Sequence, residues 1–259
     1  MLLRTFKTDK LVTNVYDSRV EMGKAAAMEA AAYLRWLLAN KEDVYAVFAA
    51  APSQNEFLAE LSVASDIAWQ RVHALHMDEY VGLSANATQG FGNFLKRSIF
   101  DKLPFASVHY IGTEKQPEQA CADYEKLISA HEIDVVFMGI GENGHIAFND
   151  PHVADFNDPK SIKKVDLDLM CRQQQVNDAC FASLDKVPQY ALTLTIPTLY
   201  SAHRIFCIVP GSTKAQAVKK TVCGEISTQC PASILRTHDY ATRYVDTDSG
   251  KYVIDEYKL

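Results

Sequence analysis

A glycine-rich segment that directly follows an apolar run constrains this chain more than any other feature. The run 133–137, IDVVF, predicts a strand buried on both faces, and the next residues, 138–151, read MGIGENGHIAFNDP. Gly139, Gly141 and Gly144 allow a sharp turn and leave space for a ligand. Open α/β sheets bind ligands in loops at the carboxyl ends of their central strands. The segment therefore predicts a binding loop, with a plain glycine turn as the alternative.

Two groups of polar residues in and near such loops predict chemistry. His145 and Asp150 bring together an imidazole that titrates near neutral pH and a carboxylate that can orient it or hold its charged form. A second predicted strand, 71–77, ends at Asp78 and Glu79. Two acids at the end of a strand fit poorly in a core and well in a site. We expect both segments to contribute to one candidate active site.

Strands and helices are predicted to alternate along the chain. The helical patterns lie between most of the predicted strands, which are expected near 44–50, 71–77, 107–111, 133–140, 191–196, 204–210 and 241–246. This alternation predicts an α/β fold with a mostly parallel, doubly wound, Rossmann-like sheet and helices on both faces. No linker or repeat divides the sequence, so we expect a single domain over 1–259. The polar stretch 152–190 is expected to begin as a loop and to form a lid over the site.

Helix starts are marked by capping patterns. Ser18 with Glu21 forms a capping box that predicts a long helix reaching about Asn40. Ser53 with Glu56 predicts a second capping box after the first central strand. Further helices are expected to open at Pro117-Glu118 and, capped by Ser212 or Thr213, near Lys214.

Composition excludes several classes of function. The net charge of −6 and the lack of a block of basic residues argue against a nucleic-acid partner. None of the six cysteines forms a CxxC pair, and no stretch resembles a signal peptide, so a reduced, cytoplasmic protein is expected. No apolar stretch is long enough for a membrane partner. His73 and His76 suggest a metal pair with Asp78, but strand alternation puts the two histidines on opposite faces, and we expect no metal.

Motifs along most of the chain resemble the glucosamine-6-phosphate deaminase (isomerase) family, whose patterns read approximately DEYxGL and GxGxxGHIxFNEP. The matching stretches lie in the family's order and are 78–83, 139–151, 187–193 with Thr198-Leu199, 210–215, and 231–235 with His238. Several motifs in order are more specific than one glycine loop.

The resemblance implies roles for the site residues. Asp78 matches the base that moves a proton between two neighbouring carbons, with a turn or capping acid as the alternative. His145 matches the ring-opening histidine, with a structural histidine as the alternative. Asp150 stands where the family usually has glutamate, and Asn143 where many members have aspartate. The shorter Asp150 can shift its contact with His145 by more than about 1 Å, an error that can cost about 10²-fold in rate. Substrate contacts are expected from Glu79, Gly141 and Gly144.

The phosphate contacts of the family are matched less well. Its loop contains Gly-Gly-Thr-Pro, whereas residues 49–54 read AAAPSQ, and its arginine position is occupied by Ala179. Lys214 matches the family's phosphate lysine, and Ser53 with free amides at a helix start can still bind an anion, a simple capped helix being the alternative. We expect weaker binding than is usual for the family, or a substrate altered at that end.

The family's reaction is the expected function. It opens an amino-sugar phosphate, isomerises it through an enolamine and releases ammonia, converting glucosamine 6-phosphate to fructose 6-phosphate without a cofactor. The expected partner is a small-molecule sugar phosphate, and a homo-oligomer is left open. One alternative is a 6-phosphogluconolactonase-like hydrolase, which shares the fold but usually reads GxGxDGHxASLFP at the histidine loop. The other is a non-catalytic sugar-phosphate sensor.

Overall fold

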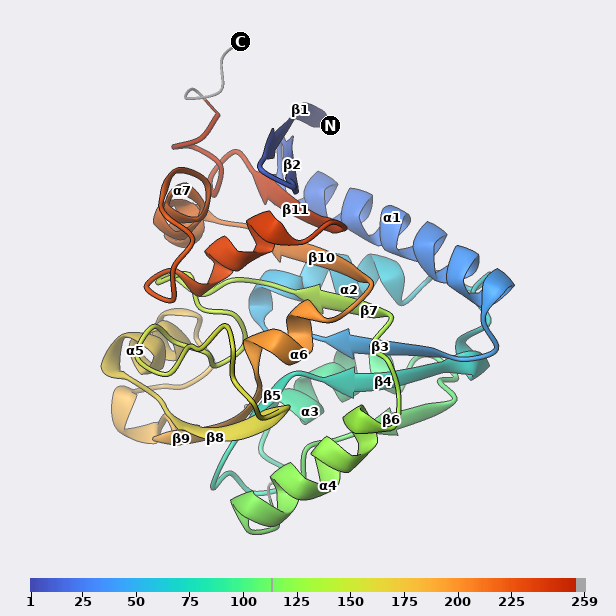
Figure 1. Cartoon of the computed structure of the whole chain (residues 1–259), viewed down its shortest axis with the longest axis vertical. Helices are drawn as coiled ribbons and strands as arrows, with labels where there is room; N and C mark the ends of the chain where they lie inside the picture. Colours follow the sequence, from blue (N-terminus) through green and yellow to red (C-terminus); the bar gives the residue numbers. More distant parts are fainter. Residues whose placement is uncertain (113, 255–259) are drawn as a thin grey trace.

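A mixed sheet forms the centre of the computed structural model, which describes residues 1–112 and 114–254. Its strands are β1 (Leu2–Thr8), β2 (Leu11–Tyr16), β3 (Val44–Phe48), β4 (Val72–His76), β6 (Ser107–His109), β7 (Val135–Met138), β10 (Arg204–Val209) and β11 (Ala241–Asp246). The spatial order is β1-β2-β11-β10-β7-β3-β4-β6. β1 pairs antiparallel with β2, and every other neighbouring pair in this sheet is parallel. The expected mostly parallel α/β fold is confirmed (Figure 1).

A second, smaller sheet is antiparallel and has the order β5-β9-β8. Its strands are β5 (Asp78–Tyr80), β8 (Ile162–Asp166) and β9 (Tyr190–Leu194). The strand expected near 191–196 therefore exists, but it lies in this sheet. The sequence analysis did not predict β1, β2, β5 and β8. Local sequence patterns missed β5 because it is only three residues long. They missed β8 because its sequence, IKKVD, exposes two of its five side chains.

Helices cover both faces of the main sheet. They are α1 (Arg19–Asn40), α2 (Asn55–Leu61), α3 (Phe91–Leu95), α4 (Pro117–Ser129), α5 (Leu169–Asn177), α6 (Ile196–Tyr200) and α7 (Ala215–Cys223). In Figure 1, α4 and α6 lie in front of the strands, and α2 and α3 lie behind them.

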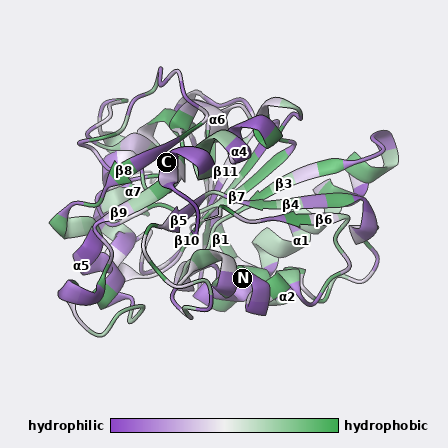
Figure 2. Cartoon of the chain, turned by 90° about the horizontal axis from the view of Figure 1, so that it is seen from below, coloured by the Kyte–Doolittle hydropathy of each residue, from purple (hydrophilic) through white to green (hydrophobic). Residues whose placement is uncertain are grey.

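Each face of the main sheet has its own hydrophobic core, because successive side chains of a strand point to opposite faces. In β7, Phe137 packs with side chains of α1, α2 and α3, whereas its neighbours Val136 and Met138 pack with side chains of α4, α6 and α7. The same alternation separates Phe48 from Val47 in β3. In Figure 2 these central strands are largely hydrophobic, while α5 and much of the periphery are hydrophilic. The doubly wound arrangement expected from the sequence follows from this two-sided burial.

Two of the expected helix caps are wrong. Ser18 does cap α1, since its hydroxyl accepts a hydrogen bond from the backbone N–H of Glu21 at 3.3 Å. No side chain caps α2 or α7, because each begins after a 3₁₀ turn, Pro52–Gln54 and Ser212–Lys214 respectively. Ser53, Ser212 or Thr213 were expected to accept hydrogen bonds from backbone amides at these helix starts. Backbone carbonyls of the turns accept hydrogen bonds from such amides instead. The Ser53 hydroxyl instead accepts a hydrogen bond from Nε2 of Gln54 at 3.1 Å.

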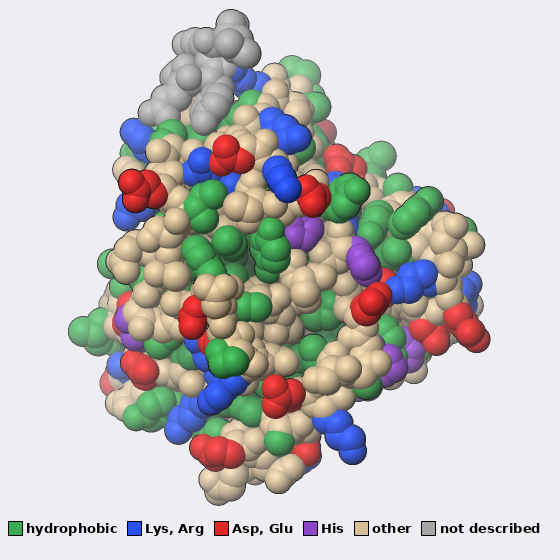
Figure 3. All heavy atoms as spheres, in the orientation of Figure 1, with side chains coloured by type: hydrophobic (Ala, Val, Ile, Leu, Met, Phe, Trp, Pro, Cys, Tyr) green, Lys and Arg blue, Asp and Glu red, His purple; other side chains and the backbone are tan. Residues whose placement is uncertain are grey.

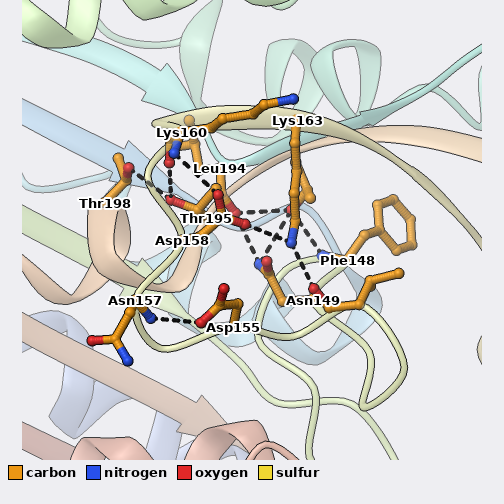
Figure 4. A network of polar contacts seen from close by, with 12 residues as sticks. Phe148, Asn149, Asp155, Asn157, Asp158, Lys160, Lys163, Leu194, Thr195 and Thr198 are labelled. Carbon is orange, nitrogen blue, oxygen red and sulfur yellow. Dashed lines mark hydrogen bonds and ion pairs between the residues drawn. The ribbon is translucent and has the colours of Figure 1, made fainter.

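The segment expected to form a lid is tied to the rest of the fold by polar contacts. Lys163 pairs with Asp158 at 2.8 Å and donates to the carbonyl of Val153 at 2.6 Å, which folds residues 151–161 into turns. Thr195 donates to the carbonyl of Lys160 at 2.7 Å, as Figure 4 shows. The early part is a loop as expected, and the later part forms β8 and α5. That this segment opens and closes as a lid stays a prediction.

In Figure 3, lysine and arginine side chains are scattered among aspartate and glutamate over the face shown. Among the residues that the structure describes, no helix combines the length and the apolar character needed to cross a bilayer.

Candidate active site

The candidate site lies where four neighbouring parallel strands end. Strands β10, β7, β3 and β4 are adjacent, and the loop after each one contributes to a single cavity. The chain leaves β3 toward β4 and β6, then returns to place β7 on the other side of β3. This reversal of strand order opens a crevice at the carboxyl ends, which is the usual ligand position in doubly wound sheets.

The cavity brings together predicted residues from distant parts of the chain. Asp78 follows β4, Gly141 and His145 follow β7, Ser53 follows β3, and Lys214 follows β10. All five line the same cavity. Apolar side chains complete much of the wall, among them Met77, Phe91, Ile140 and Phe148. Asn143, Asp150, Glu79 and Gly144 are not part of the lining.

Asn143 and Asp150 lie behind His145 and hold its loop. The carboxamide of Asn143 donates to Oδ1 of Asp150 at 2.7 Å, and its Oδ1 accepts from the backbone N–H of His145 at 3.0 Å. Nδ1 of His145 is 2.9 Å from Oδ1 of Asp150. The ring N–H is not aimed at that oxygen, so the contact is electrostatic and falls short of a hydrogen bond. The expected pair is therefore placed to orient His145 despite its shorter acid.

Asp150 is held in its charged form. Burial raises the pKa of its carboxyl, but the nearby His145 and contacts from Asn143 and Cys171 outweigh burial and lower the pKa to about 2. Burial, with Asp150 beside it, in turn raises the pKa of the Cys171 thiol, which stays protonated. An ionised acid behind His145 stabilises a positive charge on the imidazole. Cys171 was not singled out from the sequence.

His145, Asp150 and Cys171 also form a three-residue group whose ligand atoms lie within 4.8 Å of one another. Asp150 already neutralises and positions neighbouring protein groups. We assign the group a role in orienting His145 and no metal.

Two glycines of the loop are required by close contacts. A Cβ added to Gly141 would lie 2.1 Å from Cε1 and 2.3 Å from both nitrogens of the His145 ring. The imidazole thus stacks directly on the Gly141 backbone. Gly144 has φ +89°, and a Cβ there would lie 2.6 Å from Sγ of Cys230. Gly144 therefore shapes the turn and packs against the segment beginning at Pro231, whose Ala232 amide donates to its carbonyl at 2.8 Å.

Asn149 fixes the end of the loop. Its carboxamide donates to the carbonyls of Ile146 at 2.9 Å and Leu194 at 2.8 Å. The amide of Phe148 donates to Oγ1 of Thr193 at 3.1 Å. These contacts attach the histidine loop to β9, as Figure 4 shows for Asn149 and Leu194, and support the left-handed backbone of Ala147 at φ +50°.

Asp78 is a buried carboxylate at the cavity wall. Only 6% of the residue's surface is exposed, and no described residue donates a hydrogen bond to the carboxylate. Burial, with a smaller contribution from Glu79, raises its pKa well above the value of 3.8 for an ordinary aspartate. A base with a raised pKa matches the requirements of proton transfer to and from carbon near neutral pH.

The neighbours of Asp78 are structural. The Glu79 carboxylate accepts backbone N–H groups of Tyr80 at 2.9 Å, Phe91 at 2.9 Å and Gly92 at 2.8 Å, so it fixes the start of α3. It does not line the cavity, and the expected substrate contact stays a prediction. His76 accepts from the Ile111 amide at Nε2 and is 2.9 Å from the Asp78 carbonyl at Nδ1. Both ring nitrogens are thereby used to hold the backbone that carries Asp78.

The segment around α5 adds polar residues that the sequence analysis missed. Gln174, Gln175 and Asp178 of α5 and its C-terminal cap line the cavity, as does Gln54 after β3. Gln174 and Asp178 are four residues apart, and this spacing places them on one face of a helix. It could have predicted from the sequence that the two side chains lie together. Arg172 lies in the same helix, but its guanidinium donates to the carbonyls of Leu184 and Val187. It therefore does not replace the arginine missing at Ala179.

Comparisons with known proteins agree on the relationship. The family model described as glucosamine-6-phosphate isomerases/6-phosphogluconolactonase matches residues 17–244. A glucosamine-6-phosphate deaminase of Bacillus cereus (strain B4264) is 33% identical over 193 residues, covering 73% of this chain and 72% of that protein. The corresponding protein of Lactobacillus helveticus (strain DPC 4571) is 32% identical over 207 residues, covering 80% and 84%.

Solved structures match over nearly the whole chain. A monomeric glucosamine-6-phosphate deaminase superposes with a TM-score of 0.84 at 28% identity, covering 92% of this chain and 98% of that chain. A 6-phosphogluconolactonase from Thermotoga maritima superposes with a TM-score of 0.75 at 19% identity, covering 92% and 100%. At 19% identity, the second comparison shows a shared fold alone.

Proposed function

Because the chain belongs to the glucosamine-6-phosphate isomerase/6-phosphogluconolactonase family, we propose that it is an enzyme that isomerises an amino sugar and releases its nitrogen as ammonia. The curated relatives carry the name glucosamine-6-phosphate deaminase, so glucosamine 6-phosphate is the reference compound. The observation that carries the proposal is a buried carboxylate of raised pKa, Asp78, in the same cavity as an imidazole backed by an ionised aspartate.

Ring opening is assigned to His145. The imidazole moves a proton from the anomeric hydroxyl to the ring oxygen, which yields the open-chain aldehyde. It carries a positive charge in transit, and the ionised Asp150 at 2.9 Å stabilises that charge. The stack on Gly141 and the Asn143 contacts keep the ring in position.

Isomerisation is assigned to Asp78. Its carboxylate removes the proton from C2 of the aldehyde, giving an enolamine, and returns a proton to C1. The product is a 2-imino ketose, which water hydrolyses to a ketose and ammonia. One carboxylate serves both carbons if it lies over the C1–C2 face. A hydrophobic wall that includes Met77 and Phe148 excludes water and supports the raised pKa of Asp78.

The test is ammonia release together with ketose formation from a panel of hexosamines and their 6-phosphates. In deuterated water, proton transfer through an exchanging carboxyl should place deuterium at C1 of the ketose. Asp78→Asn should retain ligand binding and lose turnover by several orders of magnitude, because the amide cannot accept the proton. Near-native isomerisation by Asp78→Asn would remove this residue from the mechanism.

Two other outcomes identify the alternative functions. Hydrolysis of 6-phosphogluconolactone without ammonia release from any hexosamine would identify a lactonase. Tight sugar binding without conversion of any substrate would identify a sensor.

A further inference from the structure

The buried face of α5 is largely polar, although the buried side of a helix is usually an apolar stripe. Its buried residues are Cys171, Gln174 and Gln175, and their spacing places them on one face of the helix. Two large apolar side chains of α5, Leu169 and Met170, are instead exposed. The buried polar groups need partners, and each of the three residues contacts a different part of the candidate active site.

Gln174 and Gln175 hold α5 against the two segments that carry the catalytic candidates. Oε1 of Gln174 accepts a hydrogen bond from the backbone N–H of Glu142, in the histidine loop, at 2.9 Å. The hydroxyl of Tyr80 donates to Oε1 of Gln175 at 2.7 Å, and Tyr80 belongs to the strand that begins at Asp78. These contacts fix the position of α5 relative to both candidates.

Cys171, the third residue of this face, lies against His145 and Asp150. Its Sγ, a ring nitrogen of His145 and a carboxylate oxygen of Asp150 all lie within 4.8 Å of one another, and Cys171 is 1% exposed. Burial raises the pKa of the Asp150 carboxyl, and three neighbouring side chains lower it, those of His145, Asn143 and Cys171. Of these three, Cys171 alone comes from outside the histidine loop.

The two oxygens of the Asp150 carboxylate differ in their contacts. Oδ1 accepts from the carboxamide of Asn143 at 2.7 Å and lies 2.9 Å from Nδ1 of His145. Oδ2 is buried, and no hydrogen bond of ordinary geometry reaches it from the described residues. A buried acceptor without a donor is costly, and a carboxylate rotates easily about its last torsion. A donor to Oδ2 would fix the carboxylate plane and thereby the approach of Oδ1 to His145.

The Cys171 thiol has the chemistry for that donor. Burial, with Asp150 beside it, raises the pKa of the thiol, so the S–H group persists at neutral pH. A thiol is a weak donor, but a charged acceptor strengthens the hydrogen bond. Because the donor is weak, it leaves most of the negative charge of Asp150 available to stabilise a positively charged imidazole.

We propose that Cys171 is a positioning residue whose thiol donates to Oδ2 of Asp150 and holds the carboxylate in the orientation that serves His145. Cys171 does not line the cavity, so it acts through Asp150 and not on the substrate. The expected effect on turnover rests on the function proposed above, whereas the contact between thiol and carboxylate does not.

Two substitutions separate a hydrogen-bond donor from a packing group. Cys171→Ala should lower kcat for ammonia release about tenfold with little change in KM, the loss expected for one weak hydrogen bond to a charged group. Cys171→Ser keeps a donor and should restore kcat to within about threefold of the native value. A native kcat in Cys171→Ala, or equal losses in the alanine and serine variants, would overturn the proposal.

The matched control is Cys207→Ala. Cys207 is also buried, lies in β10 and does not line the cavity. Its substitution removes a thiol from the core without touching the Asp150 carboxylate, so it should lower the melting temperature and leave kcat unchanged.

Infrared spectroscopy tests the contact without turnover. The S–H stretching band of Cys171 is assigned by its loss in Cys171→Ser. Asp150→Asn replaces the charged acceptor with a neutral one and should move this band to higher frequency, because the hydrogen bond weakens. A band that Asp150→Asn leaves in place would refute the contact. If no hexosamine releases ammonia, the proposed function fails, and the S–H band still decides whether the thiol binds Asp150.

Discussion

Substituting Gly141 by alanine tests whether the position of the His145 ring controls catalysis. The added Cβ would lie 2.1 Å from Cε1 of His145, and ordinary contacts begin at 3.4 Å, so the ring must retreat by about 1.3 Å. Displacement of a catalytic group by about 1 Å costs about 10²-fold in rate. Gly141 lacks a positive φ, so the backbone accepts alanine and the steric contact with His145 is the main effect.

We expect Gly141→Ala to lower kcat about 10²-fold while changing KM little, because the ring acts on proton transfer more than on binding. The assay is ammonia release under saturating substrate, with the melting temperature measured in parallel. Gly112→Ala is the matched control, since its Cβ would meet flexible Glu114 and Lys115 side chains at 3.3 Å or more. It should leave kcat unchanged.

The result that would refute this reasoning is a native kcat in Gly141→Ala with an unchanged melting temperature. The imidazole would then tolerate displacement, and ring opening would not depend on it. If the variant melts much lower, the His145 ring resonances report directly whether the ring has moved in the folded fraction.

Three further predictions concern the acids of the site. Asp150→Glu should preserve or raise kcat and Asp150→Ala should lower it, as steady-state kinetics will show; a wild-type rate in Asp150→Ala would contradict the orienting role assigned to this residue. Glu79→Gln should destabilise the fold by about 1–3 kcal/mol in denaturant unfolding, because three backbone N–H groups lose a charged acceptor; unchanged stability would argue against the structural role. The raised pKa of Asp78 means that its ionisation favours the unfolded state, so stability from this group falls as pH rises above 3.8 toward the folded-state pKa. Asp78→Asn should therefore melt higher than the native enzyme, with a difference that grows as pH rises above 3.8 toward the folded-state pKa of Asp78; a constant difference would contradict the raised pKa.

Local sequence patterns were sufficient to locate the central strands and the main loops of the site. The apolar runs of β3 and β7 and the polar residues after β4 and β7 are recognisable within a few residues of chain. Because parallel strands end at one edge of the sheet, Asp78 and His145 were expected together, and both line the cavity. The roles assigned to them remain proposals that the variants above test.

The use of each side chain was decided by contacts that no local pattern contains. Asp78 and Glu79 are adjacent acids at one strand end, yet Asp78 lines the cavity while Glu79 binds amides 12 and 13 residues further along. Tyr80 donates to Gln175 across 95 residues, which brings α5 to the cavity.

The sequence by itself therefore determined the central parallel strands, the histidine loop and the two central catalytic candidates, because apolar runs and glycine turns are short-range features. Only the tertiary structure decided that Ser53 is free of capping, that Glu79 holds the start of α3, and that Asp178 lines the same cavity as Lys214. These outcomes depend on which groups from distant segments pair with buried donors, acceptors and charges. Those partners come together only when the chain has packed.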